Sequence, residues 1–152
     1  MAVQTGSSQE LIDGLINTFR ELNIKVRSVP DAQTRQASSG GASARDVVRR
    51  LRDDELRFSQ ALKERVTGVP MPDILGEETP IVGTEQSDDT TAVLIAQFGY
   101  AREVTLALLR PLEESEWDQE VTGGTTIRAR IQELVENDRK QLERILGMLP
   151  AQ

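Results

Sequence analysis

The sequence predicts an all-α protein, a four-helix bundle with one long crossover connection. Four stretches of the 152-residue chain repeat apolar residues at helical spacing. No stretch alternates apolar and polar residues for long enough to predict a strand. Residues 69–87, between the second stretch and the third, contain too much proline and glycine for more than about two turns of helix. A connection of this length is typically functional or carries the chain from one end of the fold to the other.

The first helix is predicted over residues 8–27. Ser7 followed by Glu10 is a capping-box pattern, and Pro30 follows the helix. Residues 31–42 are polar, with paired serines and glycines, so they predict a surface loop. The apolar face comprises Leu11, Ile12, Leu15, Ile16, Phe19, Leu22 and Val26.

The second helix is predicted over residues 44–67. Ser43 with Asp46 three residues later marks its start, and Gly68 and Pro70 end it. Its apolar face is continuous and comprises Val47, Val48, Leu51, Phe58, Leu62 and Val66.

The third helix is predicted over residues 88–110, with Ser87 and the two aspartates after it at the start and Pro111 at the end. Residues 92–109 are apolar on nearly all sides. Such a helix is either central in its domain or shared with a partner. We therefore expect a homodimer, while a helix that is merely well covered by loops explains the same pattern equally well.

The fourth helix is predicted over residues 126–149. It follows the Gly123-Gly124 turn, with Thr125 as its expected cap and Pro150 as its end. Its apolar positions are Ile127, Ile131, Leu134, Val135, Leu142, Ile145 and Leu149.

The chain contains no histidine and no cysteine. This excludes cysteine nucleophiles, disulfides, Cys/His zinc sites and histidine acid–base chemistry. A net charge of −7 disfavours binding to nucleic acid and anionic membranes. No apolar run approaches the ~20 residues of a membrane span, and the first eight residues do not resemble a signal peptide. We expect one domain over residues 1–152, located in the cytoplasm, without nucleic-acid or membrane partners.

Two carboxylates interrupt apolar faces: Glu55 in the second helix and Asp138 in the fourth. Burying an unpaired carboxylate is costly, so both should have partners or lie at a wet cleft. An internal arginine–carboxylate and amide network is favoured over catalysis, because catalysis also needs a substrate pocket.

Further polar residues lie at the edges of these faces. Arg50 is one turn before Asp54 on one edge of the second helix. Asn137 and Gln141 are four residues apart, so they stack on one flank of the fourth helix. After Pro111, an acidic turn surrounds the only tryptophan, Trp117, which we expect to pack inward as an anchor.

Two segments make the chain similar to the DinB-like (DinB/YfiT) superfamily. Residues 40–55 (GGASARDVVRRLRDDE) resemble that family's loop and second-helix start. Residues 108–149 resemble the sequence pattern of its last helices. The resemblance implies a bundle with a long crossover, and in many members a divalent metal. Where the family has a tryptophan before the serine of the loop, this chain has Ala42.

Residue by residue, the resemblance implies that the family's metal ligands correspond to Arg50, Asn137 and Gln141. None is histidine. Asparagine and glutamine offer only weak carbonyl donors, and arginine carries a fixed positive charge that repels a cation. We therefore expect no metal and no cofactor.

Our hypothesis is that the Arg50 guanidinium occupies the volume where related proteins hold a metal. The amide oxygens of Asn137 and Gln141 would bind it, together with one nearby carboxylate. The candidate carboxylates are Asp54, Glu55 and Asp138.

Three functions remain open from the sequence. The first is a bundle without metal-dependent catalysis that binds a small ligand or a protein partner, with Arg50 favouring an anionic group and Trp117, Tyr100 or Phe58 as candidate apolar walls. The second, implied by the resemblance, is an enzyme of the thiol-dependent transferase or isomerase type working without a histidine-bound metal. The third is a structural subunit that dimerises through its third helix.

Overall fold

The computed structural model describes residues 7–38, 40–68, 89–122 and 124–149. Within these ranges the protein is mostly helical, which confirms the all-α prediction. The four long helices are α1 (Ser8–Lys25), α3 (Ala44–Val66), α4 (Thr91–Leu109) and α6 (Ile127–Met148). The short elements are α2 (Asp31–Thr34), α5 (Glu114–Trp117) and an antiparallel pair of strands, β1 (Glu120–Thr122) and β2 (Thr125–Thr126).

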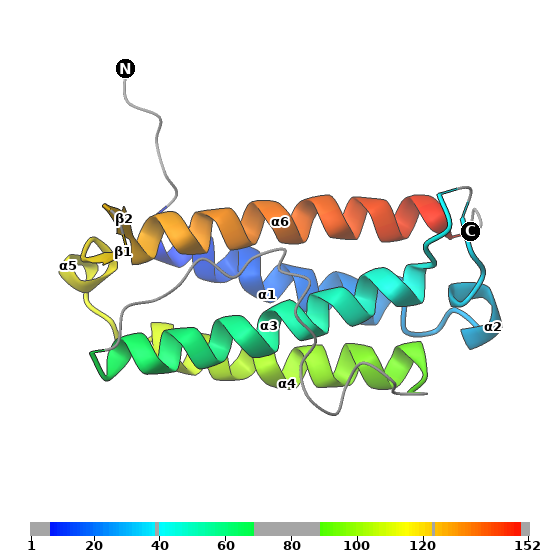
Figure 1. Cartoon of the computed structure of the whole chain (residues 1–152), viewed down its shortest axis with the longest axis horizontal. Helices are drawn as coiled ribbons and strands as arrows, with labels where there is room; N and C mark the ends of the chain where they lie inside the picture. Colours follow the sequence, from blue (N-terminus) through cyan, green and yellow to red (C-terminus); the bar gives the residue numbers. More distant parts are fainter. Residues whose placement is uncertain (1–6, 39, 69–88, 123, 150–152) are drawn as a thin grey trace, which may run out of the picture.

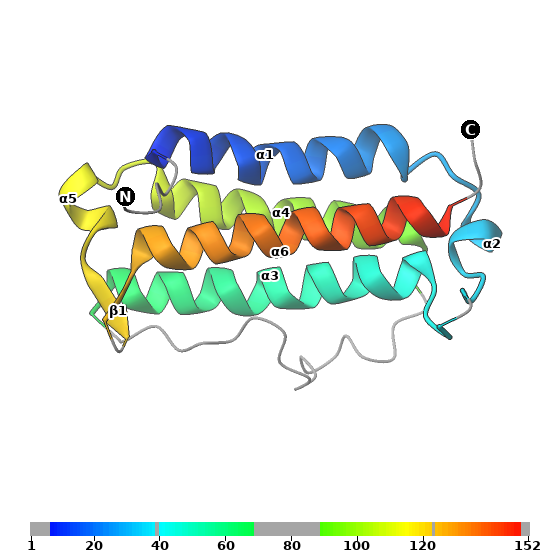
Figure 2. The same ribbon diagram turned by 90° about the horizontal axis from the view of Figure 1, so that it is seen from above.

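The four long helices lie side by side (Figures 1 and 2). Helices α1 and α6 run in one direction, and α3 and α4 run in the other. Each of α1 and α3 packs against both α4 and α6. Two contacts fix the parallel register of α3 and α4: Arg45 bonds to Asp89 and Arg52 to Gln97, at sequence separations of 44 and 45. The predicted crossover over residues 69–87 lies outside the described residues.

Side-chain caps confirm two of the predicted helix starts and correct the other two. The Ser7 hydroxyl accepts from the Glu10 amide, and Ser43 forms a complete capping box with Asp46. Helix α4 starts later than predicted, with Thr90 rather than Ser87 or the aspartates before its first turn. The cap of α6 is Thr126, not Thr125, because Thr125 belongs to β2.

The predicted loop over residues 31–42 begins with the short helix α2, which contacts the start of α4. The Asp31 carboxylate accepts from the backbone amide of Thr91 at 2.9 Å. The hydroxyls of Thr34 and Thr91 lie 2.6 Å apart, and both side chains are buried. These partners are about sixty residues apart in the chain, so no local pattern predicts this element.

The buried apolar side chains form two clusters. The cluster near α5 and the sheet comprises Leu11, Leu15, Phe58, Ala61, Leu62, Leu106, Leu109, Trp117, Val121, Ile127, Ile131 and Leu134. The cluster toward the opposite end comprises Leu22, Val26, Ala44, Val47, Val48, Leu51, Leu94, Ile95, Phe98 and Ile145. Every long helix contributes to both clusters, so each helix has a position where one cluster gives way to the other.

Candidate functional site

A buried guanidinium, that of Arg102 on α4, lies where the two apolar clusters meet. The side chain is 1% exposed. Its Nη1 donates to the backbone oxygen of Leu15 at 2.8 Å and lies 2.9 Å from the Asp138 carboxylate. Its Nη2 donates to Glu55 at 2.8 Å and to Asp138 at 3.2 Å. One arginine therefore binds a carboxylate from α3, a carboxylate from α6 and the backbone of α1.

Two threonines complete what we call the buried ion network: Thr18, Glu55, Arg102, Thr105 and Asp138. The Thr18 hydroxyl donates to Asp138 at 2.9 Å, and the Thr105 hydroxyl donates to Glu55 at 2.7 Å. All five side chains are buried. Each of the four long helices contributes, and on each helix these residues separate the two apolar clusters. The network is thus a polar layer across the middle of the fold.

The charges in this layer are coupled. Burial by itself would lower the pKa of Arg102, but the neighbouring Glu55 and Asp138 outweigh it and raise the pKa above its usual range. Burial raises the pKa of Asp138, and the adjacent Arg102 offsets this only in part. One guanidinium therefore faces two carboxylates in this buried layer.

The expectation that Glu55 and Asp138 have charged partners is confirmed. The partner itself, Arg102, was missed by the sequence analysis. Its signal was present: Arg102 is a charged residue on the side of α4 that also carries Phe98 and Leu106. The signal was ambiguous, because α4 is apolar on nearly all sides and the exposed Glu103 interrupts it as well.

A second polar group lies along the edge of α3. The Nε of Arg50 donates to Asp54 at 3.2 Å, and Nη1 of Arg57 donates to the same oxygen at 3.2 Å. The spacing of these three residues puts them on one edge of the helix. Of the carboxylates expected to support Arg50, Asp54 therefore lies beside it, whereas Glu55 and Asp138 bind Arg102.

The two predicted amides lie together on α6, where Gln141 Nε2 donates to Asn137 Oδ1 at 3.5 Å. Val135 of α6 packs against Gly14 of α1, and Asn137 points about 200° away from it around the helix. Helix α6 packs against both α1 and α3, so helical geometry puts Asn137 on the flank away from α1. We use the name α3–α6 seam for the helix edges that carry Arg50, Asp54, Asn137 and Gln141.

The register of the two helices supports this placement. Glu55 and Asp138 lie at the same level because both bind Arg102. The two helices run in opposite directions (Figures 1 and 2), so Arg50 lies level with residue 143, about 3 Å along the axis from Gln141. Arg50, Asn137 and Gln141, which the sequence analysis grouped through the resemblance, thus belong to neighbouring levels of the two helices.

Asp54 gives the seam a measurable pH dependence. The residue is 5% exposed, and burial raises its pKa to about 6 despite the charges of Arg50 and Arg57. Between pH 4 and 6 the folded protein therefore binds more protons than the unfolded chain, and this group's contribution to stability falls as the pH rises. We expect the unchanged protein to lose about 2 kcal/mol of unfolding free energy relative to Asp54→Asn across this window. Urea unfolding of both proteins at several pH values measures the difference, and a constant difference would contradict the raised pKa.

The donor groups of the site do not fit a divalent metal. Among the described residues, no three carboxylates converge on a metal-sized position. The buried carboxylates Glu55 and Asp138 already bind the chain's own cation, and Arg50 would repel a metal in the seam. These side chains offer charge and hydrogen bonds to a bound molecule.

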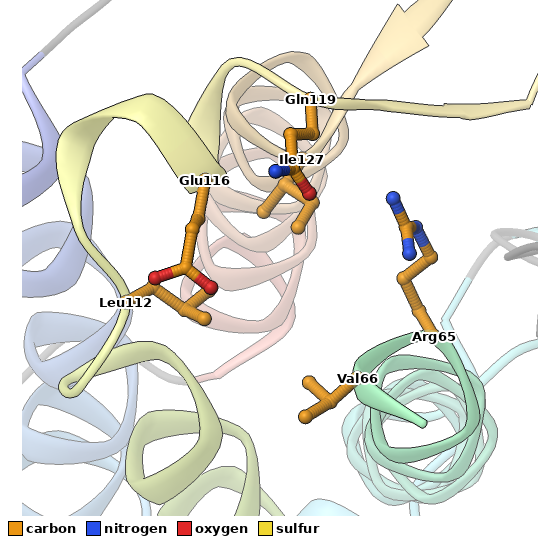
Figure 3. A pocket seen from close by; sticks show the side chains of 6 residues that line it. All are labelled: Arg65, Val66, Leu112, Glu116, Gln119 and Ile127. Atoms are coloured by element: carbon orange, nitrogen blue, oxygen red, sulfur yellow. The ribbon is translucent and has the colours of Figure 1, made fainter. Parts of the chain in front are cut away.

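At least two pockets lie among the described residues, and these two are not lined by Arg50, Asn137 or Gln141. The first, of about 80 Å³, lies where the end of α3 meets α5 and the start of α6 (Figure 3). It is lined by Arg65, Val66, Leu112, Glu116, Gln119 and Ile127. The second, of about 150 Å³, lies between α1 and α4 and is lined by Ile16, Phe19, Gly99, Arg102, Glu103, Leu106 and Arg110.

The three candidate wall residues have different surroundings. Phe58 and Trp117 are buried in the apolar cluster near α5, and the inward packing expected for Trp117 is confirmed. Tyr100 is 76% exposed on α4. None of the three lines either described pocket.

The described residues define a mostly helical protein whose four long helices share one buried ion network. No protein-family model, no curated protein and no solved structure matches this chain. The site is therefore interpreted from this chain's own geometry and chemistry.

Proposed function

We propose that the chain is a DinB-like four-helix bundle that has replaced the family's metal site and binds a small ligand or a protein partner without metal-dependent catalysis. The buried ion network is the observation that carries this proposal. Its two carboxylates, Glu55 and Asp138, are bound by a cation of the chain itself at 2.8 and 2.9 Å. The parallel direction of α3 and α4 supports the long crossover expected of such a bundle.

The α3–α6 seam is the proposed ligand site. Arg50 keeps 31% of its side chain exposed, so a small anionic group can reach the guanidinium. Asn137 and Gln141 add amide donors and acceptors from the facing helix. A carboxylate or phosphate group fits these donors better than a cation does, because Arg50 carries a fixed positive charge.

A metal-free enzyme of the thiol-dependent transferase type is the alternative, and one observation favours it. Asp54, with its pKa raised to about 6, lies beside Arg50 and has the protonation range of a general base near neutral pH. Thiol-conjugation assays with and without added metal separate the two functions. Turnover that is lost in Arg50→Ala would favour the enzyme.

Restoring the histidines tests the proposed family correspondence. If Arg50, Asn137 and Gln141 occupy the family's ligand positions, the triple variant Arg50→His, Asn137→His, Gln141→His is expected to bind close to one Zn²⁺ or Ni²⁺ per chain. The unchanged protein is expected to bind neither ion. Calorimetric titration gives the stoichiometry, and thermal unfolding with and without metal shows the stabilisation.

The matched control for this titration is the double variant Asn137→His, Gln141→His, which keeps Arg50. It is expected to bind at least ~10-fold more weakly, because it has two ligands and a nearby positive charge. Stoichiometric metal in the unchanged protein would contradict the loss of the metal site. A folded triple variant that binds no better than the double variant would contradict the correspondence.

A further inference from the structure

The outward face of α4 is apolar along its whole length. The exposed apolar residues of this face are Val93, Ala96, Tyr100, Val104 and Ala107. At 100° per residue they span an arc of about 80°, so they form one stripe. Glu103 and Arg110 are exposed at one edge of the stripe, where they form a 2.8 Å ion pair. We call these five apolar residues the α4 stripe.

Either a membrane or a protein partner could cover an exposed apolar surface of this kind. Helix α4 is long and apolar enough to cross a membrane, judged by length and composition alone. However, α1 and α3 pack on its other sides and its Arg102 is buried in the ion network, as in a core helix. A protein surface packed on the one remaining face fits these contacts better than a lipid environment on all sides.

The spacing of the residues in the α4 stripe is the same in both chain directions, so two antiparallel copies of the stripe match each other. Its spacings are 3, 4, 4 and 3, which is symmetrical about Tyr100. In an antiparallel pair of α4 helices centred on Tyr100, Val93 therefore faces Ala107 of the partner subunit, and Ala96 faces Val104 of the partner subunit. Away from the axis each valine meets an alanine, and both contacts occur twice, as two-fold symmetry requires.

Charges at the ends of α4 favour the same arrangement. Arg110 follows the last residue of the helix, and Asp89 precedes its cap. In the antiparallel pair Arg110 lies level with residue 90 of the partner subunit, and therefore near Asp89 of the partner subunit. The two helix dipoles are also antiparallel, which is favourable.

From this self-complementarity we propose that the α4 stripe binds a second copy of the chain, with the two α4 helices antiparallel and Tyr100 on the two-fold axis. The dimer does not depend on the ligand site in the α3–α6 seam, which lies on other helix faces. Either proposal can therefore fail without the other.

The oligomeric state gives the first test. Light scattering at tens of micromolar is expected to give twice the 16.8 kDa chain mass. Tyr100→Arg is expected to raise the dimer Kd by roughly tenfold or more, because it places two like charges on the axis. Ile24→Arg is the matched control: Ile24 is an apolar residue of α1, 60% exposed and outside the stripe, and its substitution should leave the mass unchanged.

Single cysteines test the register, and the chain has no native cysteine to interfere. Tyr100→Cys is expected to cross-link to itself with a short bis-maleimide. Val93→Cys alone is not, because the two copies lie about 21 Å apart along the paired helices. A mixture of Val93→Cys and Ala107→Cys chains, allowed to exchange subunits, is expected to cross-link.

A monomer at every concentration would overturn the proposal, and so would a dimer that Tyr100→Arg leaves intact. Self-cross-linking of Val93→Cys would show a parallel pair, in which each residue faces its own copy, and would also overturn it. Binding of the monomer to lipid vesicles through Tyr100 would identify a membrane as the occupant instead.

Discussion

Replacing Arg102 with methionine is expected to lower the free energy of unfolding by about 3–5 kcal/mol, the typical loss when one partner of a buried ion pair is removed. The substitution leaves Glu55 and Asp138 buried without their cation. A loss of this size is a large fraction of the ~5–15 kcal/mol that holds an average domain folded. Urea denaturation followed by far-UV circular dichroism measures it.

Two further variants show whether the loss comes from the uncompensated charges. The triple variant Arg102→Met, Glu55→Leu, Asp138→Leu removes the whole charged group and is expected to recover most of the stability. Arg110→Met is the matched control, because Arg110 also lies at α4 and pairs with a glutamate, but at the surface. It is expected to change stability by less than ~1 kcal/mol.

The pH dependence of Arg102→Met adds a check that a simple packing defect would not reproduce. Without the guanidinium, burial raises the pKa of Asp138 further, because only the Thr18 hydrogen bond still favours the charged form. The folded variant then favours the protonated carboxyl, so the loss of stability should be smaller at pH 5 than at pH 8. An equal loss at both pH values would assign the effect to packing alone.

Replacing Trp117 with alanine is expected to cost about 3–5 kcal/mol, the usual range for removing a fully buried aromatic side chain. Trp117 is 1% exposed and packs in the cluster near α5. The Arg128 guanidinium lies 5.7 Å from the centre of the Trp117 ring. It also forms ion pairs with Glu114 and Asp118, which precede and follow Trp117 in the chain. The ring therefore fixes α5 against the start of α6.

Circular dichroism is the appropriate measurement, because the substitution removes the only tryptophan of the chain. Trp117→Phe should lose less than Trp117→Ala, because the phenyl ring fills part of the space. Ile24→Ala is the control for an exposed apolar residue outside the α4 stripe and is expected to change stability by no more than ~0.5 kcal/mol. Equal effects of Trp117→Ala and Ile24→Ala would contradict the anchoring role.

The long helices were predictable because their signals are local. Apolar spacing and the serines at positions 7 and 43 act within a few residues, and the structure reproduces both caps. The start of α6 was off by one residue because Thr125 pairs with Thr122 in the sheet. Helix α2 was missed because its stabilising contacts reach Thr91, far along the chain.

The candidate site was also predictable from the sequence only in part. The sequence showed that Glu55 and Asp138 interrupt apolar faces and that such carboxylates need partners, since an unpaired buried charge is too costly. Helical spacing also paired Arg50 with Asp54 and Asn137 with Gln141, each pair one turn apart on its own helix.

Only the tertiary structure decided which cation meets the buried carboxylates and which face of α4 stays open. Glu55 and Asp138 bind the same guanidinium from sequence separations of 47 and 36 residues. Helix α4 is apolar on nearly all sides, so its composition could not show which side packs inward. Packing of α1 and α3 against it buries Arg102 and leaves Tyr100 exposed, because a helix in this position contacts its neighbours on part of its circumference only.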